Sequence, residues 1–170
     1  MKAKNVSMTS FLTQGGVIAA IYVVLTLLFQ AISFGPIQFR ISELLCVLPY
    51  FTPAAIPGLF IGCLLGNILG GAAIYDIIFG SLATLIGALG SYAIRRHKPL
   101  VALPPILANT LIIPFVLRYA YAMPDALWYL MATVGIGEIL AIGVLGTGVM
   151  YLLDKNAYVA GFLRGSIHRA

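Results

Sequence analysis

The chain has 170 residues, of which 61% are hydrophobic and 9% are charged, with ten Lys and Arg residues against five Asp and Glu residues. Soluble domains average about 45–50% apolar and about 25% charged residues, so this composition argues against a soluble enzyme and against a free nucleic-acid binder. A mean hydropathy of +1.04 indicates an integral membrane protein instead.

Long uncharged stretches predict six transmembrane helices. They are expected at about residues 11–33, 41–56, 58–73, 76–94, 100–120 and 125–152. The second and third come from one uncharged run, residues 44–75, which we expect to break at Pro57 and Gly58, so each is short for a span of roughly 20 residues. The sequence therefore predicts an all-α integral membrane protein, a compact six-helix bundle that forms a single membrane domain over residues 1–170.

The basic residues predict the orientation of this bundle. If the N-terminus is cytoplasmic, eight of the ten Lys and Arg residues fall in cytoplasmic segments, and only Arg40 and Arg118 fall outside. This distribution follows the positive-inside rule, so we expect both termini in the cytoplasm. The first apolar run is long for a signal peptide and no small-residue cleavage site follows it, so we expect it to be retained.

Three charged residues gather on the outer side of the predicted topology. Arg40 and Glu43 lie three residues apart, a spacing that would place them on one face of a helix start, either in a ligand site or as an interfacial ion pair. Asp76 opens the fourth predicted helix, where it either contributes to a site or caps the helix. Because charges are costly in a bilayer, such residues usually face a bundle interior or a cavity.

Three further polar residues are predicted to lie deeper in the membrane. Asn67 and Asn109 each precede a charged residue at the outer interface by nine positions, which places them about 13 Å below it, as site residues or as interhelical hydrogen-bond partners. Glu138 lies about 20 Å into the last predicted helix, with no basic residue within a helical turn. It is either a protonated acid bonded to a backbone group, or a ligand-binding carboxylate or proton carrier.

Small residues form a face along the first predicted helix. Gly15 and Gly16 lie four residues before Ala19 and Ala20. Such a face allows close approach either of another helix in the bundle or of a helix from a partner protein.

No motif for catalysis or metal binding is evident. The sequence has no Walker A motif, no HExxH or similar metal-ligand cluster and no GxSxG motif. We therefore expect no enzymatic activity, no cofactor and no metal, so any ATP hydrolysis would belong to other subunits.

Residues 34–43, FGPIQFRISE, resemble the QueT family of substrate-binding S components in energy-coupling factor (ECF) transporters. Residues 58–67 and the pair Tyr75–Asp76 add to this resemblance, which spans about residues 10–155. QueT proteins are assigned to the uptake of queuosine precursors, which are 7-deazaguanines. The resemblance implies an S-component-like fold in the plasma membrane of a prokaryote.

The resemblance also implies partners and a mechanism. An S component binds its substrate from outside, associates with a transmembrane T component and two cytoplasmic ATPases, and topples in the membrane to release the substrate inward. Small residues on the first helix of S components contact the T component, a role that Gly15, Gly16, Ala19 and Ala20 match. The implied partners are these subunits, the lipid bilayer and a small planar nucleobase-like substrate, with no nucleic acid.

A 7-deazaguanine suits the polar residues of the predicted bundle. Its N1–H and exocyclic amine are adjacent donors for a carboxylate, so we expect Glu138 and Glu43 to bind it, with Asn67 and Asn109 as amide partners. Aromatic rings could stack on its planar face or belong to the interfacial belts of the membrane. The expected substrate site comprises these side chains and their polar and aromatic neighbours: Gln38, Arg40, Glu43, Asn67, Tyr75, Asp76, Asn109, Trp128 and Glu138.

Other interpretations remain open. The same fold could bind another vitamin, such as riboflavin, thiamine, biotin or folate. The chain could also be a structural membrane subunit without a ligand, or an oligomeric channel or proton-coupled exporter with Glu138 as the carrier. The sequence does not distinguish 7-cyano-7-deazaguanine, 7-aminomethyl-7-deazaguanine and queuine, nor does it say which carboxylate binds which part of the ligand.

Overall fold

The computed structural model describes residues 7–33 and 39–164, and all regular structure in these residues is helical. The predicted all-α class is therefore confirmed. The α-helices are α1 (Met8–Leu28), α2 (Gln30–Ser33), α3 (Ala55–Leu69), α4 (Ile74–Ala93), α5 (Leu103–Tyr119), α6 (Leu127–Glu138), α7 (Thr147–Lys155) and α8 (Ala157–Leu163). Two 3₁₀-helices, η1 (Ile41–Tyr50) and η2 (Lys98–Leu100), and one π-helix, η3 (Ile139–Gly146), complete the set.

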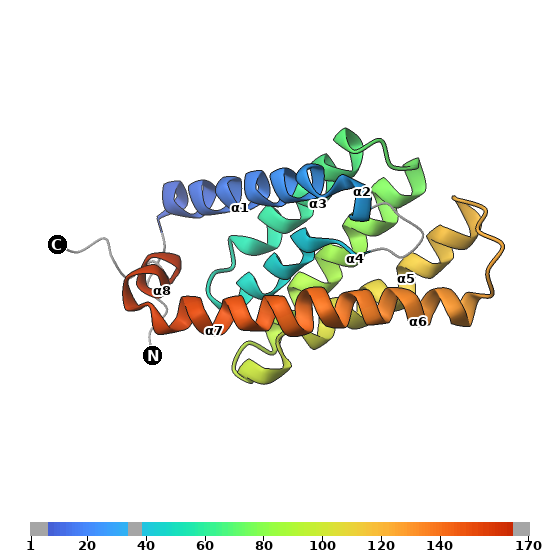
Figure 1. The fold of residues 1–170 in the computed structure, drawn as a ribbon. Helices are drawn as coiled ribbons and strands as arrows, with labels where there is room; N and C mark the ends of the chain where they lie inside the picture. Colours follow the sequence, from blue (N-terminus) through green and yellow to red (C-terminus); the bar gives the residue numbers. More distant parts are fainter. Residues whose placement is uncertain (1–6, 34–38, 165–170) are drawn as a thin grey trace.

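Four helices in the described residues are long and apolar enough to cross a membrane: Met8–Leu28, Ile74–Ala93, Lys98–Tyr119 and Leu127–Lys155. The last of these joins α6, η3 and α7 into one continuous helix of 29 residues (Figure 1). The helices at the second and third predicted spans are apolar but shorter. At their usual rise, η1 extends about 20 Å and α3 about 23 Å, against a hydrocarbon core of about 30 Å.

Prolines determine where the two short helices begin and end. The sequence predicted a break at Pro57 and Gly58, but the break lies at residues 51–54, and both residues belong to the first turn of α3. A proline in the first turn of a helix removes only an N–H that has no intrahelical partner, so Pro57 starts the helix instead of ending it. Pro49 lies inside η1, whose 3₁₀ form replaces the expected α-helix over residues 41–56.

The 3₁₀-helix η1 lies in the interior of the bundle. It packs against α1, α3, α4, η3 and α7, and Figure 1 shows it between α1 and the long C-terminal helix. Its side chains from Leu45 to Leu48 are all buried in the main hydrophobic core. A short central helix can begin at the mid-depth of the bundle, so polar residues at the start of η1 lie inside the protein.

Glycines allow α1 and α3 to approach closely. A Cβ atom on Gly58 would lie 2.7 Å from the carbonyl oxygen of Gly15, and one on Gly62 would lie 3.1 Å from the Cα of Ala19. Gly66 continues this face of α3 toward Thr26 of α1. The glycine face of α3 therefore packs within the bundle, and Gly15 and Ala19 lie in this internal interface.

The two other small residues of α1 lie on its outer face. Ala20 is exposed, and a Cβ atom added to the exposed Gly16 would meet no atom within 4 Å. The predicted small-residue face is thus divided between two sides of the helix. Only Gly16 and Ala20 stay accessible to a partner.

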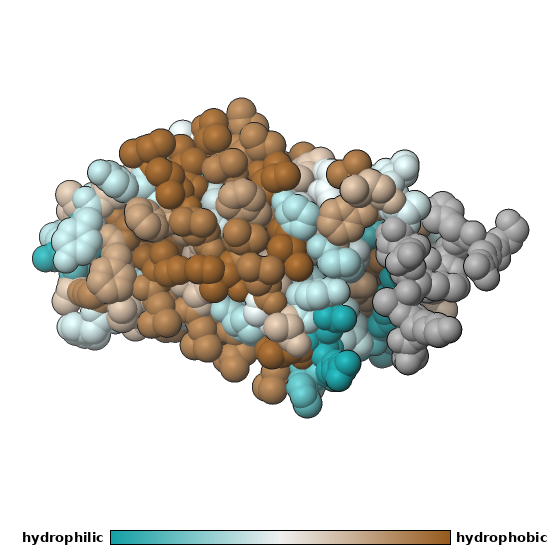
Figure 2. Space-filling view, turned by 180° about the vertical axis from the view of Figure 1, so that it is seen from behind, coloured by the Kyte–Doolittle hydropathy of each residue, from teal (hydrophilic) through white to brown (hydrophobic). Residues whose placement is uncertain are grey.

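Polar and apolar residues are distributed as in a membrane protein. Large apolar side chains on the long helices are exposed, including Val24, Ile86, Leu111 and Ile136. Figure 2 shows that hydrophobic residues cover the middle of one face, with hydrophilic residues toward its ends. Because a bilayer solvates apolar groups and not polar ones, the polar residues in the middle of the spans turn inward.

Ion pairs hold together the end of the bundle where α7 and α8 meet. Asp154 pairs with Lys98 of η2 through Oδ2 and with Arg164 through Oδ1 at 2.5 Å. Gln14 of α1 donates a hydrogen bond from Nε2 to the carbonyl of Phe162 at 3.0 Å, so the start of α1 lies at this end as well (Figure 1). This end gathers basic residues that the sequence assigns to the cytoplasm.

Candidate functional site

A buried polar cluster lies where η1, α3, α4, α5 and α6 meet. It brings together three of the five acidic residues of the chain, one arginine and two amides, all buried. The members are Arg40, Glu43, Asn67, Asp76, Asn109 and Glu138. Six of the nine expected substrate-site residues therefore gather in one region, although they come from five separate segments of the chain.

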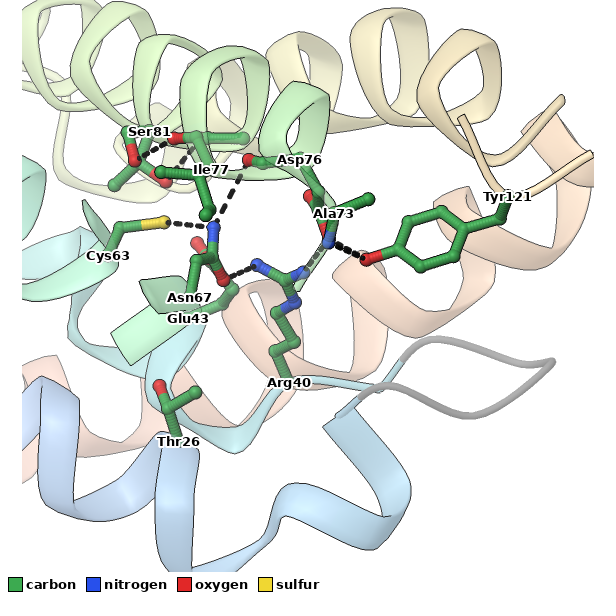
Figure 3. A network of polar contacts seen from close by, with 12 residues as sticks. Thr26, Arg40, Glu43, Cys63, Asn67, Ala73, Asp76, Ile77, Ser81 and Tyr121 are labelled. Atoms are coloured by element: carbon green, nitrogen blue, oxygen red, sulfur yellow. Dashed lines mark hydrogen bonds and ion pairs between the residues drawn. The ribbon is translucent and has the colours of Figure 1, made fainter. Parts of the chain in front are cut away.

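Arg40 joins two helices at one side of the cluster. Its Nη2 donates to Asp76 Oδ2 at 2.9 Å and forms a buried ion pair, while its Nη1 donates to Asn67 Oδ1 at 3.0 Å (Figure 3). Asn67 in turn donates from Nδ2 to the backbone carbonyl of Asp76 at 3.2 Å. The predicted i, i+3 pairing of Arg40 with Glu43 is thus replaced by a pair between the start of η1 and the first turn of α4.

Asp76 does not cap α4. The N-cap residue of this helix is Ala73, which has no side-chain cap bond, and Asp76 lies in the first turn with Oδ2 directed to Arg40. The other oxygen, Oδ1, is buried and has no hydrogen-bond partner among the described residues. A buried oxygen without a partner carries a desolvation cost, so this atom can accept a hydrogen bond from a ligand.

Tyr121 borders the cluster beside Asp76. Its hydroxyl donates to Asp76 Oδ2 at 3.0 Å and accepts the backbone N–H of Ala73 at 3.1 Å (Figure 3). Partial burial raises the pKa of the Tyr121 phenol, so the hydroxyl stays protonated as a donor at neutral pH. The sequence pattern does not separate this residue from the other tyrosines near the membrane interface.

Three neutral donors hold Glu43. The Tyr22 hydroxyl donates to Oε1, and Oε2 accepts from the Cys46 thiol at 2.9 Å and from Asn109 Nδ2 at 3.4 Å. Tyr22 and Cys46 are absent from the predicted site. The i, i+3 spacing of Glu43 and Cys46 was available as a signal, but an apolar setting indicates a thiol that serves as a small hydrophobic group.

A small cavity lies between Glu43 and Glu138. It has a volume of about 10 Å³ and is lined by Arg40, Glu43, Gly80, Asn109, Ile113 and Glu138. Glu138 is 8% exposed, and its Oε2 is buried without a hydrogen-bond partner in the part of the chain that the structure describes. A volume of this size is enough for about one water molecule, so the two carboxyl groups lie close together around it.

Gly80 provides the space beside the ion pair. A Cβ atom at this position would lie 2.9 Å from Asp76 Oδ1 and 3.2 Å from Asn67 Nδ2. Both atoms belong to side chains that Arg40 already holds. Any larger residue would therefore displace the polar cluster or fill the cavity.

The remaining expected site residues do not reach this cavity. Tyr75 is 57% exposed and Trp128 is 73% exposed. Tyr75 borders a separate apolar groove of about 580 Å³ between α4 and α5, together with Phe79, Leu111, Phe115 and Tyr119. Gln38 lies outside the described residues.

Comparison with known proteins identifies the family. The family model described as "QueT transporter" matches residues 12–155. The chain is 43% identical over 85 residues to the "Queuosine precursor transporter QueT" of Lactococcus lactis subsp. cremoris (strain MG1363), a match that covers 48% of this chain and 50% of that protein. The chain thus spans about half the length of this curated relative. No solved structure matches.

The match with the family model extends from α1 through α7 and includes all six residues of the buried polar cluster. It also agrees with a helical chain that has four helices of membrane-spanning length. This chain belongs to the QueT transporter family.

Proposed function

We propose that this protein is the substrate-binding S subunit of an ECF-type importer in the plasma membrane of a prokaryote, and that it captures a 7-deazaguanine queuosine precursor from outside. The observation that carries this proposal is the buried Glu138, whose unpartnered Oε2 lines a cavity together with Glu43 and Asn109. Family membership and the name of the Lactococcus relative support the class of substrate.

The chemistry of the cavity suits a purine-like base. A 7-deazaguanine precursor offers N–H donors on the base and, in some precursors, on its side arm, and Glu138 Oε2 and Asp76 Oδ1 are buried acceptors without partners among the described residues. The base also carries a carbonyl oxygen, which an amide or guanidinium group can bind, and Asn109 and Arg40 both line the cavity. Hydrogen bonds, and not stacking on Tyr75 or Trp128, thus account for recognition.

Binding requires the cavity to open. Pockets for small ligands usually have volumes of about 300–1,000 Å³, far above the 10 Å³ of this cavity. Glu138 is the last residue of α6, and the π-helix η3 begins directly after it. Because π-helical turns are rare and concentrate at functional sites, we infer that this junction allows Glu138 to move when the ligand enters.

The topology that we propose has six crossing segments and two cytoplasmic termini. The segments are α1, η1, α3, α4, α5 and the continuous helix α6–η3–α7. The short segments η1 and α3 pack inside the bundle, which supports a partial or tilted crossing. ATP hydrolysis belongs to separate ATPase subunits, and a T component docks on the outer face of α1, where Gly16 and Ala20 are exposed.

A ligand titration of the purified protein in detergent tests the proposal. The panel contains the three 7-deazaguanines, with guanine, riboflavin, thiamine and biotin for comparison. A ligand that binds only the folded protein raises its melting temperature in a saturable way. We expect this response from a deazaguanine only; a response to a vitamin instead would overturn the substrate, and no response from folded protein would overturn the S-subunit proposal.

The variant Glu138→Gln tests the site itself. It keeps the shape of the side chain and removes the carboxylate, so we expect deazaguanine binding to weaken by about 100-fold, as for loss of one partner of a buried charged hydrogen bond. The matched control is Asp125→Asn, which removes a carboxylate that does not line the cavity. Unchanged affinity in folded Glu138→Gln protein would place the ligand elsewhere.

A further inference from the structure

The charges around the cavity are unbalanced. Three carboxylates, from Glu43, Asp76 and Glu138, surround one guanidinium group, from Arg40, although the chain as a whole has a net charge of +5. The ion pair between Arg40 and Asp76, at 2.9 Å, compensates one of the three. Neither Glu43 nor Glu138 forms an ion pair with a described residue.

The hydrogen-bond partners of Glu43 are all neutral. All three donors, on Tyr22, Cys46 and Asn109, are uncharged groups. Glu43 therefore lines the cavity with neutral hydrogen-bond donors around it and with no ion pair to a described residue.

Glu138 leaves one acceptor open on the other side. Its Oε2 is buried, lines the same cavity and has no partner in the described part of the chain. A buried carboxylate is costly unless a cation or hydrogen-bond donors compensate it. A neutral base can supply N–H donors, whereas a cation supplies N–H donors together with the positive charge that two neighbouring carboxyl groups attract.

We propose that the site selects queuosine precursors that carry a protonated amine. The ammonium group binds to Glu138 Oε2, and Glu43 on the same cavity attracts it as well. This inference rests on the proposed function and deepens it. The alkylamines of 7-aminomethyl-7-deazaguanine and queuine resemble the side chain of lysine and are cationic at neutral pH. The cyano group of 7-cyano-7-deazaguanine is neutral and leaves both glutamates uncompensated.

Three ligands of nearly the same size separate charge from shape. Isothermal titration calorimetry of the full chain in detergent, at neutral pH, compares the 7-aminomethyl base with the neutral 7-hydroxymethyl and 7-cyano bases. All three bases have the same hydrogen-bonding edge, formed by N1–H, the exocyclic amine and the carbonyl oxygen. A site that recognises only this edge therefore binds them equally. We expect the aminomethyl base to bind about tenfold or more tightly than either neutral base.

The variant Glu138→Gln supplies the second comparison. We expect it to weaken binding of the aminomethyl base about tenfold more than binding of the hydroxymethyl base, because only the former loses a charge partner. The control variant Asp125→Asn should leave the preference unchanged. The comparison of ligands on the unmodified protein needs no variant, so the inference is testable even where Glu138→Gln does not fold.

The outcomes are distinct. Equal affinities for the aminomethyl and hydroxymethyl bases, or tighter binding of the cyano base, would overturn the inference and leave the proposed function in place. Equal losses for the charged and neutral bases in folded Glu138→Gln would also overturn it, since Glu138 would then bind the shared edge. No detectable binding of any of the deazaguanines to the folded protein would overturn the proposed function itself.

Discussion

At the scale of single residues, the cluster combines one compensated and two uncompensated acidic groups. Asp76 is held by Arg40 and Tyr121 through Oδ2, and both Asp76 Oδ1 and Glu138 Oε2 are buried oxygens that no described residue binds. Asp76 therefore holds α4 and η1 together through its ion pair with Arg40, whereas Glu138 lines the cavity and has no ion pair to a described residue.

Removal of Arg40 should destabilise the protein strongly. The variant Arg40→Ala leaves Asp76 buried without its cation, and such a loss costs about 3–5 kcal/mol. We expect a clear drop in the melting temperature in detergent, and a smaller drop for the double variant Arg40→Ala/Asp76→Ala than the sum of the single effects. Arg118→Ala is the matched control, because Arg118 bonds only to exposed backbone carbonyls among the described residues. Additive effects in the double variant would argue against the ion pair.

The sequence predicted which polar residues meet but not how they pair. Charges within apolar runs must face inward in a membrane protein, so Arg40, Asp76 and Glu138 were predictable as members of an internal site. The partner of Arg40 was not predictable, because Arg40 is the N-cap of η1 with an extended backbone, and the i, i+3 rule holds only within a helix. The role of Tyr121 depends on a loop that brings it to α4.

At the scale of helices, the packing of α1 on α3 decides the shape of the bundle. The glycines of α3 allow backbone contact with α1, and η1 then fills the space beside both helices. Two short helices were predicted over residues 41–73, but the break lies at residues 51–54 instead of Pro57 and Gly58, and the first of the two is a 3₁₀-helix.

A methyl group at Gly58 should disturb this interface. In Gly58→Ala the added Cβ would lie 2.7 Å from the backbone carbonyl of Gly15, which cannot move independently of α1. We expect destabilisation of about 1–3 kcal/mol, as for other overpacked positions. In the control Gly148→Ala the new atom meets nothing within 4 Å, so its melting temperature should stay the same or rise. Equal behaviour of the two variants would show that the α1–α3 contact is loose.

At the scale of the whole molecule, the polar side chains of the cluster are buried inside the bundle, and large apolar side chains cover its outer surface. The cluster lies within the bundle, and the basic residues gather at the end where Lys98 and Arg164 meet Asp154. With this end in the cytoplasm, the connection between α5 and α6, which contains Tyr121, faces the exterior. A substrate from outside would thus approach the cavity from the side of Asp76 and Tyr121.

Chemical labelling of cells tests this orientation. Both native cysteines are buried, so single introduced cysteines report their own position. We expect a membrane-impermeant maleimide to label Asp125→Cys in intact cells, and to label His97→Cys only after the membrane is opened. The reverse pattern would mean that the bundle is inserted the other way and that the cavity opens toward the cytoplasm.

The central claim is that the cavity bounded by Glu43 and Glu138 binds the deazaguanine, and the most direct measurement is an experimental structure of the protein with 7-aminomethyl-7-deazaguanine bound. We predict ligand density between η1, α5 and α6, with a ligand nitrogen within hydrogen-bond distance of Glu138 Oε2 and the cavity expanded around it. Density in the apolar groove beside Tyr75 and Tyr119, with Glu138 unchanged, would contradict the account.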